Sequence, residues 1–420
     1  MRHVLPAYHW SRGVTANLIY GFPARRLQII GVTGTNGKTT TSSYIASILR
    51  SAGYRVGVST TAYFQINDDV TVNDTNMTVT DPFKVQKMLA KMRAKRVDWV
   101  VLEVTAHGLQ QYRLWGVPFK AAVITNLTQD HLDYFGTMEH YAAAKAKLLK
   151  LLPDVIVLNR DDDWFDYFNK FPAGQHKMSY GTSDEADCRI EEASLGAKGS
   201  TFKLTIDKTN EMKLATKLAG KFNVYNATAA VATAYLLHVD RQSIGEGLLA
   251  LESVPGRLES IEAGQPFSVI VDYAHTPDAL QNLLETLQAL TKRRVILVFG
   301  SCGDRDALKR PGMGKIAATL ADRIVLTDEE PYSEDPAKIR KQIFKGIAKV
   351  KGGEAKCKEI PGRRDAIEHA FNIARKDDVV VLTGMGNQSY MTIGAGKKIP
   401  WDDREVAREL LKEKLSTKQP

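Results

Sequence analysis

The sequence predicts an α/β protein whose sheets are mostly parallel. Short apolar runs alternate with helical patterns along most of the chain, which is the order expected of βαβ units. A glycine-rich run stands between the first apolar run and the first helical pattern, and a Pro-Gly break near residue 255 separates two sets of units. At 420 residues, the chain has room for two or three domains.

The first set of units spans residues 27–253. The runs expected to form strands alternate with helical patterns at 42–49, 83–94 and 138–151, and they are Leu27–Ile30, Trp99–Leu102, Ala121–Ile124 and Val155–Leu158. Between roughly 174 and 217 the sequence turns polar, with short alternating stretches such as Thr201–Ile206, so we expect antiparallel strands at the sheet edge. Helical patterns resume at 223–239 and 241–252.

The second set spans residues 254–420 and predicts a Rossmann-like α/β domain. Val254–Glu259 contains the Pro-Gly break and is interpreted as a hinge. The expected strands that follow it are Ser268–Val271, Val295–Phe299, Arg323–Leu326 and Val379–Leu382. Residues 1–26 are too short for a domain, and we interpret them as a lead-in segment.

Composition excludes several classes of protein. The chain has 44% hydrophobic and 25% charged residues, as ordinary globular proteins do. No apolar run approaches the roughly 20 residues of a membrane span, and the N-terminus lacks the apolar region of a secretory signal, so we expect a cytoplasmic protein. The three cysteines, Cys188, Cys302 and Cys357, are widely spaced, which favours neither a disulfide framework nor a zinc ribbon.

The chain is basic, with a formal net charge of +9 and a pI near 9.2. Its Lys and Arg residues are dispersed and do not form a stripe with interleaved aromatic residues, as a nucleic-acid-binding face would. The charge therefore favours anionic small-molecule substrates over nucleic acid.

The glycine-rich run Gly31–Thr41 is the strongest single indication of function. At a strand-to-helix turn, its backbone N–H groups and the positive end of the helix dipole would face an anion, so it predicts binding of ATP or GTP in a P-loop ATPase-type domain. Lys38 would reach the outer phosphates, and the Thr39 hydroxyl would ligate Mg²⁺. Val32 occupies the place of the first glycine in the strict P-loop pattern, which leaves a chance loop as the alternative.

Charged residues follow the next two predicted strands. Glu103 ends one of them, where a carboxylate faces the crevice in which parallel sheets bind ligands, and we expect it to be a second Mg²⁺ ligand. Asp130, His131 and Asp133 follow the next strand and suit a metal or phosphate site. Lys145 lies among small residues of a predicted helix. The alternative is structural, with His131 as a capping or core residue and Lys145 as a solvated helix residue.

Eight motifs occur in order along the chain. They are Gly-Thr-Asn-Gly-Lys-Thr-Thr at 34–40, Glu-Val-Thr-Ala-His-Gly-Leu at 103–109, Asn-Leu-Thr-Gln-Asp-His-Leu-Asp at 126–133, Tyr-Ala-Ala-Ala-Lys at 141–145, Gly-Lys-Phe-Asn-Val-Tyr-Asn at 220–226, Pro-Gly-Arg-Leu-Glu at 255–259, Asp-Tyr-Ala-His-Thr-Pro at 272–277, and Gly-Asp-Arg-Asp at 303–306 with Lys309-Arg310. Over residues 20–415 the chain thereby resembles the Mur ligase family, the ATP-dependent amide-bond-forming enzymes of peptidoglycan precursor synthesis. It is most similar to the MurE branch, which adds the third residue of the stem peptide.

The resemblance implies a mechanism. ATP would phosphorylate a substrate carboxylate, and an amine would attack the acyl phosphate, releasing phosphate and ADP. Lys38 would stabilise the transferring phosphoryl group, Thr39 and Glu103 would hold one Mg²⁺, and His131 would hold a second. Lys145 falls at the family's carbamoylated lysine, whose carbamate can ligate metal.

The resemblance also implies an ATP-binding set. Asn226 falls at the adenine contact and Arg257 at a phosphate contact, while Asp272 and His275 line the nucleotide side of the C-terminal domain. The remaining members are Gly34, Thr35, Asn36, Gly37, Lys38, Thr39 and Thr40, and the catalytic set is Lys38, His131, Lys145 and Arg257. Structural alternatives are a helix cap for Asn226, a hinge salt bridge for Arg257 and a strand end for Asp272. The C-terminal domain would close over ATP through the hinge.

The substrate-recognition residues depart from the MurE pattern. Diaminopimelate-adding members carry Asp-Asn-Pro-Arg where this chain has Glu329-Glu330-Pro331-Tyr332, so the recognition arginine is missing. Gln388 stands where a carboxylate would pair with the distal ammonium, whereas Arg305 matches the residue that binds the α-carboxylate. Glu329 and Glu330 would favour a side chain ending in a cation, such as lysine or ornithine, unless they only begin a solvated loop.

The part of the chain expected to bind the acceptor also departs from the MurE pattern. Full-length members carry an N-terminal domain that grips uridine diphosphate, but only about 26 residues precede the P-loop strand here, so we expect that domain to be absent or vestigial. Thr78 in the run Asn76–Pro82, together with Thr105 and Arg113, is expected on the side of the anionic acceptor. We expect the acceptor to be a UDP-MurNAc-peptide or a similar molecule. Two alternatives stay open, a separate partner that supplies the missing domain and a different acceptor.

Other functions stay open too. A folylpolyglutamate-type or cyanophycin-type ligase shares the two domains and often lacks the uridine-binding one. An ATPase subunit that amidates a muropeptide usually carries a four-cysteine zinc ribbon, for which this chain has too few cysteines. A non-catalytic nucleotide-gated module is disfavoured because Lys38, Glu103, His131 and Lys145 are all present. We expect a monomer.

Overall fold

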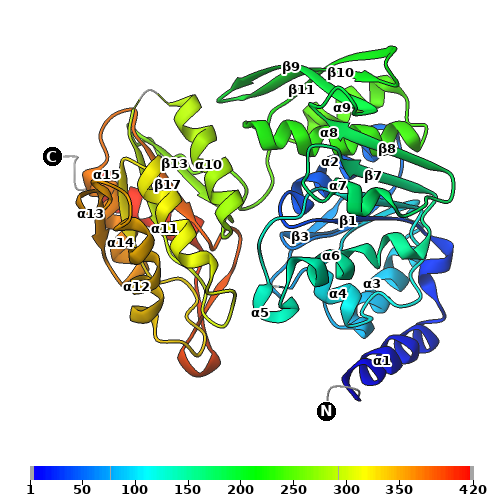
Figure 1. The fold of residues 1–420 in the computed structure, drawn as a ribbon, viewed down its shortest axis with the longest axis horizontal. Helices are drawn as coiled ribbons and strands as arrows, with labels where there is room; N and C mark the ends of the chain where they lie inside the picture. Colours follow the sequence, from blue (N-terminus) through cyan, green and yellow to red (C-terminus); the bar gives the residue numbers. More distant parts are fainter. Residues whose placement is uncertain (1–3, 76, 292, 417–420) are drawn as a thin grey trace. The chain divides into compact units, whose positions relative to one another are not determined.

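The chain divides into two compact units (Figure 1). The computed structural model describes residues 4–75, 77–291 and 293–416. The first unit comprises residues 1–128 and 137–252, and the second comprises 129–136 and 253–420. The segment 129–136 therefore groups with the second unit, although the sequence interpretation placed it in the central domain. None of the helices in the described ranges combines the length and the apolar character that crossing a membrane requires.

The first unit contains an 11-stranded sheet in the order β11-β10-β9-β8-β7-β6-β1-β5-β2-β3-β4. Neighbouring strands from β8 to β2 run parallel, which confirms the predicted mostly parallel sheet. The strands are β1 (Gln28–Thr33), β2 (Val56–Ser59), β3 (Tyr63–Ile66), β4 (Asp69–Val72), β5 (Trp99–Glu103), β6 (Ala121–Ile124), β7 (Val155–Asn159), β8 (His176–Gly181), β9 (Cys188–Gly196), β10 (Gly199–Ile206) and β11 (Asn210–Thr216).

The polar region at 174–217 is only partly the antiparallel edge that was expected. Strands β9, β10 and β11 are antiparallel neighbours, as predicted. The expectation is wrong for β8, which pairs parallel with β7. The short helix α7 (Phe165–Asn169) lies between these two strands in the chain, and such a crossover lets the second strand run in the same direction as the first.

Helices cover both faces of this sheet (Figure 1). The connection from β1 to β2 runs along the sheet in one direction, and the connections from β2 through β5 and β6 to β7 run in the other. Right-handed crossovers therefore place α2 on one face and α3, α4 and α6 on the other. Helices α8 and α9 pack against α2, and α1 packs against α3. The helices are α1 (Val4–Tyr20), η1 (Pro23–Arg26), α2 (Lys38–Ser51), α3 (Pro82–Ala94), α4 (Ala106–Gln110), α6 (Met138–Ala146), η2 (Leu149–Leu151), α8 (Lys221–Leu236) and α9 (Arg241–Ala250).

The second unit contains a six-stranded sheet in the order β12-β13-β17-β14-β15-β16, parallel except for β12. Its strands are β12 (Glu259–Ser260), β13 (Ser268–Asp272), β14 (Val295–Phe299), β15 (Arg323–Leu326), β16 (Cys357–Glu359) and β17 (Val379–Thr383), with β18 (Tyr390–Ile393) and β19 (Lys397–Pro400) in a separate pair. Its helices are α5 (Leu132–Phe135), α10 (Pro277–Leu290), α11 (Lys309–Leu320), α12 (Pro336–Ile347), α13 (Gly353–Lys356), α14 (Arg363–Ile373), η3 (Gly394–Gly396) and α15 (Asp403–Ser416).

The core of the second unit follows from the alternation of its strands. In β14, Val295, Leu297 and Phe299 pack with α10, α11 and α12, whereas Ile296 and Val298 pack with α14 and α15. Both faces of the sheet are thus buried, which explains why its strands appear in the sequence as unbroken apolar runs. The Rossmann-like layering predicted from those runs is confirmed.

A buried ion pair joins α14 to α15 and yields a stability prediction. Arg363 donates two hydrogen bonds of 2.8 and 2.6 Å to Asp403, and the two side chains are only 1% and 0% exposed. Replacing Arg363 by Leu leaves Asp403 buried without its cation, so we expect the free energy of unfolding in urea to fall by about 3–5 kcal/mol.

The neighbouring arginine supplies the control. Arg364 pairs with Glu409 and Glu413 at the surface, where its side chain is 40% exposed. Arg364→Leu should therefore cost less than about 1 kcal/mol. Equal losses in the two variants would contradict this account of the α14–α15 contact.

Candidate functional site

The P-loop run forms the turn from β1 to α2 in the first unit. Helix α2 begins at Lys38, and its N-cap Gly37 has φ of 82°, the left-handed region that favours glycine. A Cβ at Gly37 would lie 2.3 Å from the Asn226 side-chain oxygen, so α8 closes tightly on this turn. The Thr41 hydroxyl donates to the same oxygen at 3.3 Å. The turn therefore presents the N-terminus of a 14-residue helix, as an anion site requires.

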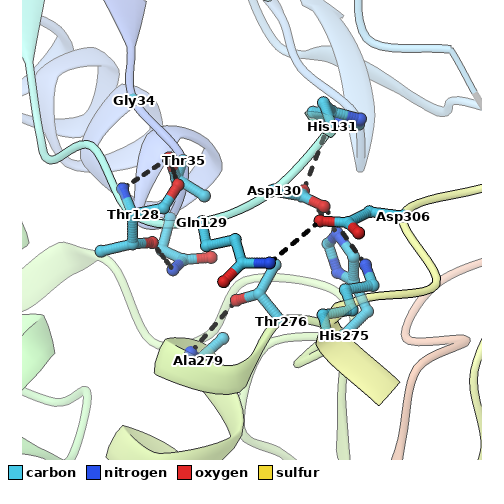
Figure 2. A network of polar contacts seen from close by, with 12 residues as sticks. Gly34, Thr35, Thr128, Gln129, Asp130, His131, His275, Thr276, Ala279 and Asp306 are labelled. Carbon is cyan, nitrogen blue, oxygen red and sulfur yellow. Dashed lines mark hydrogen bonds and ion pairs between the residues drawn. The ribbon is translucent and has the colours of Figure 1, made fainter. Parts of the chain in front are cut away.

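The segment after β6 holds the P-loop in place. The backbone N–H groups of Thr35 and Asn36 donate to the side-chain oxygen of Asn126 at 3.1 and 2.8 Å. Thr128 and Thr35 exchange two further hydrogen bonds, which Figure 2 draws. Within the loop, the Lys38 ammonium donates to the Thr35 carbonyl at 2.8 Å. The loop conformation is thus set by a neighbouring strand end, and the lysine lies against its own loop.

Glu103 lies at the end of β5, beside the P-loop. Its side chain accepts hydrogen bonds from the Thr39 hydroxyl (2.8 Å) and from both the backbone N–H and the hydroxyl of Thr61 (2.8 and 2.9 Å). The Thr61 hydroxyl also contacts the Thr78 hydroxyl at 2.5 Å. A carboxylate and hydroxyls are hard oxygen donors, the kind that Mg²⁺ prefers, so the residues fit the predicted metal. Among the described residues, no three His, Cys, Asp or Glu side chains gather as metal ligands, and the ion stays a prediction.

Lys145 lies buried on α6, with 1% of its surface exposed. Its ammonium donates to the Gly34 carbonyl of the P-loop at 2.7 Å and lies 4.4 Å from the centre of the Tyr141 ring. The alternative of a solvated helix residue is therefore excluded. The structure brings Lys145, the P-loop, Glu103 and Asn226 into one neighbourhood of the first unit.

The residues expected on the acceptor side are less closely gathered. Arg113 donates to the Val79 carbonyl at 2.6 Å, so it lies beside the segment that carries Thr78. Thr105 accepts a hydrogen bond of 3.1 Å from the Gly108 N–H and caps α4, which gives it a structural role. Asn76, the first residue of the same run, lies outside the described residues.

A cluster of charged groups occupies the second unit around Asp130 (Figure 2). The Asp130 carboxylate is 4% exposed and lies 3.2 Å from the Lys309 ammonium, 3.4 Å from the His131 ring and 3.8 Å from the His275 ring. Burial alone would raise the pKa of Asp130, but these three neighbours hold it below its usual range. Gln129 donates to Asp306 at 3.4 Å at the edge of the cluster.

The two histidines of this cluster differ in environment. Burial, and then the nearby Lys309, lower the pKa of His275 to about 4, so this ring is neutral at pH 7. One of its nitrogens lies 2.7 Å from the Tyr273 carbonyl and donates to it. His131 stands at the N-cap of α5 with φ of 57°, but its side chain makes no capping hydrogen bond, which excludes the capping interpretation.

Sequence reasoning placed Asp130 in a candidate metal or phosphate site but gave it no role of its own, and it did not include Lys309 among the functional residues. Both lie inside the quoted motifs, Asp130 directly before His131, so the signal was present. The sequence could not show that these two residues, which are 179 positions apart, form an ion pair of 3.2 Å.

Arg257 and Asp272 lie together at the start of the second unit. The Arg257 guanidinium carbon is 4.4 Å from the centre of the Tyr273 ring. Asp272 accepts hydrogen bonds from the Leu258 and Ala274 backbone N–H groups at 2.8 and 2.7 Å, and burial raises its pKa. These are the contacts of a carboxylate at a strand end, so Asp272 has the structural role that the sequence analysis gave as the alternative.

The residues predicted to bind the amino acid lie in the loops that follow β14, β15 and β17. Glu329 and Glu330 are 2% and 1% exposed, so they do not begin a solvated loop. Gln388 is buried, whereas Arg305 is exposed, with its guanidinium carbon 5.0 Å from the centre of the Tyr332 ring.

Comparisons with known proteins match both units. A model of the Mur ligase middle domain matches residues 32–234, and a model of the Mur ligase glutamate ligase domain matches residues 256–386. The UDP-N-acetylmuramoyl-L-alanyl-D-glutamate–2,6-diaminopimelate ligase of Syntrophomonas wolfei is 39% identical over 401 residues, which are 94% of this chain and 80% of that protein.

Solved structures are also similar to this chain. A structure of a UDP-N-acetylmuramoyl-L-alanyl-D-glutamate–2,6-diaminopimelate ligase, 33% identical, has a TM-score of 0.65 and covers 98% of this chain and 83% of its own. The folylpolyglutamate synthase of Mycobacterium tuberculosis, 20% identical, has a TM-score of 0.73 and covers 91% of this chain and 94% of its own. At that identity, the second likeness shows the fold alone.

The tight closure of α8 on the P-loop yields a prediction. We expect Gly37→Ala to lower the midpoint of thermal unfolding, because the new Cβ would clash with the Asn226 side chain and the residue would keep an unfavourable positive φ. Adding Asn226→Ala should restore the part of the decrease in the unfolding midpoint that is due to the clash.

Gly53→Ala is the matched control. Gly53 has φ of 83°, but a Cβ there meets no atom within 4 Å. This variant carries the same backbone cost of about 1 kcal/mol without a clash. A Gly37→Ala variant that is no less stable than Gly53→Ala would show that α8 does not constrain the turn.

Proposed function

This chain belongs to the Mur ligase family, and we propose that it is an ATP-dependent, ADP-forming ligase that joins an amino acid to the carboxylate of a UDP-MurNAc-peptide or a similar acceptor. Such a reaction builds a peptidoglycan precursor, and the relatives are named as ligases of UDP-N-acetylmuramoyl-L-alanyl-D-glutamate and 2,6-diaminopimelate. One observation carries the proposal: Thr39 links the phosphate-binding turn directly to the buried Glu103 carboxylate, and Lys145 bonds to the same turn.

The proposed chemistry follows from the poor electrophilicity of a carboxylate. Transfer of the γ-phosphoryl group of ATP to that carboxylate gives an acyl phosphate and ADP. The amine of the amino acid then attacks the acyl carbon, loses a proton and forms the C–N bond, while the C–O bond to inorganic phosphate breaks. The new peptide bond therefore consumes one ATP.

The described residues of the first unit suit the phosphoryl step. The N-terminus of α2 attracts the phosphates through its N–H groups and dipole. Lys38 adds a mobile cation, which would exchange its contact with the Thr35 carbonyl for a phosphate oxygen. Thr39 and Glu103 would hold Mg²⁺, which when bound neutralises charge on the phosphates.

Lys145 is proposed to act as a carbamate. An ammonium so close to a metal-bound, phosphate-binding turn would repel the metal, whereas a carbamate is an anion able to ligate it. Lys145 is buried beside the Gly34 carbonyl, so a change from ammonium to carbamate would change the charge directly at the P-loop turn. His131 is proposed as a ligand of a second Mg²⁺, with Asp130 orienting its ring. Arg257, Asn226 and His275 complete the proposed nucleotide contacts.

The proposal includes the cellular location, the oligomeric state and the domains of the protein. An enzyme that uses ATP and a nucleotide-linked precursor works where both are made, so we place it in the cytoplasm. We propose that it acts as a monomer, with residues 27–253 as the ATP-binding domain and 254–420 as the C-terminal domain.

A ligase of folylpolyglutamate type is the second candidate. The M. tuberculosis enzyme shares the fold over nearly all of both chains, so the fold alone does not separate the two candidates. Sequence identity favours the first candidate, at 39% against 20%. Glutamate addition to a folate would separate the two in the experiment below.

The test is release of phosphate from Mg²⁺–ATP. We expect release that depends on both UDP-N-acetylmuramoyl-dipeptide and an amino acid, with the tripeptide product identified by mass spectrometry. Turnover of tetrahydrofolate and glutamate, with none of the muramoyl acceptor, would overturn the proposal in favour of the second candidate.

Lys145 gives a sharper prediction. Replacing Lys145 by Ala should lower kcat by at least about a thousandfold, since a metal-ligating group next to the transferring phosphoryl is lost. Short-chain carboxylates should restore part of the activity if the missing group is an anion. Lys150→Ala is the control, because Lys150 is exposed and lies on η2 nearby in the chain. Full activity of the Lys145 variant would exclude the assigned role.

A further inference from the structure

Two adjacent carboxylates lie buried beyond the end of β15. The Glu329 side chain accepts a hydrogen bond from the Cys302 thiol at 2.9 Å. The Glu330 side chain accepts one from the Thr392 backbone N–H at 2.9 Å and one from the Tyr332 hydroxyl at 3.3 Å. All of these donors are uncharged, so the contacts position the two carboxylates without neutralising them.

No cation among the described residues forms an ion pair with either carboxylate. The two buried cations that influence Glu329 are Arg363 and Lys309, and each has a carboxylate partner of its own, Asp403 and Asp130. Burial accordingly raises the pKa of Glu329. A buried carboxylate without a cation is costly, so a positive charge added beside this pair would be stabilising.

Two segments enclose the pair, and each carries a buried oxygen without a partner. The first is residues 384–392. A Cβ at Gly384, where φ is 99°, would lie 2.1 Å from a Glu329 carboxylate oxygen, and Thr392 at the other end bonds to Glu330. Midway stands Gln388, which is 9% exposed and whose side-chain oxygen has no hydrogen-bond partner among the described residues.

The second enclosing segment follows β14. Cys302 bonds to the Glu329 side chain, and the Gly303 N–H donates to the Glu330 carbonyl at 2.8 Å. Directly before them stands Ser301, which is 4% exposed and whose hydroxyl also has no partner within the described ranges. Buried polar groups are nearly always hydrogen-bonded, so two such oxygens beside two uncompensated carboxylates indicate a missing donor.

Resting on the proposed function, we propose that Glu329, Glu330, Gln388 and Ser301 form a site for the side-chain ammonium of the added amino acid, which is of the lysine or ornithine class. We name these four residues the ammonium site. An ammonium offers three N–H donors and one positive charge, which match two carboxylates and a neutral oxygen acceptor.

The same chemistry selects against 2,6-diaminopimelate, the amino acid named for the relatives. Its distal end carries a carboxylate beside the ammonium. In the ammonium site that carboxylate would face two like charges, and Tyr332 next to them offers a hydroxyl in place of a cation. Arg305 is exposed and lies against the Tyr332 ring, which leaves it for the α-carboxylate at the mouth of the site.

The first experiment compares amino acids with the wild-type full chain. We expect kcat/KM for lysine or ornithine to exceed that for norleucine, which lacks the ammonium, and that for diaminopimelate by about a hundredfold or more. Turnover of diaminopimelate or norleucine at a rate equal to that of lysine would overturn the ammonium site and leave the ligase function standing.

The second experiment tests the residues. Glu329→Gln and Glu330→Gln should each raise KM for lysine about tenfold or more, and should bring the lysine-to-norleucine ratio towards one, with KM for ATP unchanged. Glu354→Gln, an exposed position in the same unit, is the matched control and should change neither. A fall in activity that leaves the lysine-to-norleucine ratio unchanged would show a structural role only.

The third experiment separates this inference from the proposed function. Binding of lysine, norleucine and diaminopimelate to the wild-type chain is measured by calorimetry with Mg²⁺–ADP present and no acceptor. Lysine or ornithine binding here, together with no phosphate release when Mg²⁺–ATP and the muramoyl acceptor are supplied in the turnover assay, would support the ammonium site and overturn the acceptor assignment. Binding of none of the cationic amino acids would overturn the ammonium site.

Discussion

The meeting of β1 and β5 in parallel register is the constraint on which the site in the first unit depends. Val32 pairs with Glu103, so the strand that ends in the carboxylate stops beside the strand that leads into the P-loop. Thr39, one residue into α2, then lies within hydrogen-bond reach of Glu103 without any long or flexible connection. The P-loop turn and a buried carboxylate are thereby placed together by the backbone ladder alone.

Three buried cations in the second unit each pair closely with a carboxylate. Arg363 pairs with Asp403, Arg310 with Glu334 and Lys309 with Asp130, and in each pair a carboxylate meets the buried cation at 3.2 Å or less. Glu329 and Glu330 have no such partner among the described residues, and neither do Asp272 and Asp306. Glu329 and Glu330 differ from those two in being adjacent carboxylates that repel one another, so a ligand that supplies a cation would stabilise them directly.

Much of the fold was accessible from the sequence, because the central strands of both sheets are buried on both faces and therefore appear as apolar runs. The exception, β8, was taken for an antiparallel edge strand, since its outer residues His176 and Lys177 are exposed and polar and its crossover helix α7 is only five residues long. The candidate site was accessible where one motif holds several of its members, as in the P-loop. It was not accessible for Asp130 with Lys309, or for Cys302 with Glu329, because those pairs form only after distant segments meet.

The location of the residues proposed for substrate recognition explains how the family pattern can change here without loss of the fold. Glu329, Tyr332 and Gln388 all lie in loops beyond the strand ends, so none of them contributes to the sheet ladder or to the apolar core. The constraints on these loops are local. Gly384 must stay small and left-handed to admit the longer Glu329 side chain, and Thr392 must stay in register to hold Glu330. On the proposed assignment, tyrosine in place of arginine removes the cation and Glu330 in place of asparagine adds a carboxylate, so these loops would favour an ammonium without a neighbouring carboxylate. The strands β14, β15 and β17 stay as they are, as a change of substrate on a constant scaffold requires.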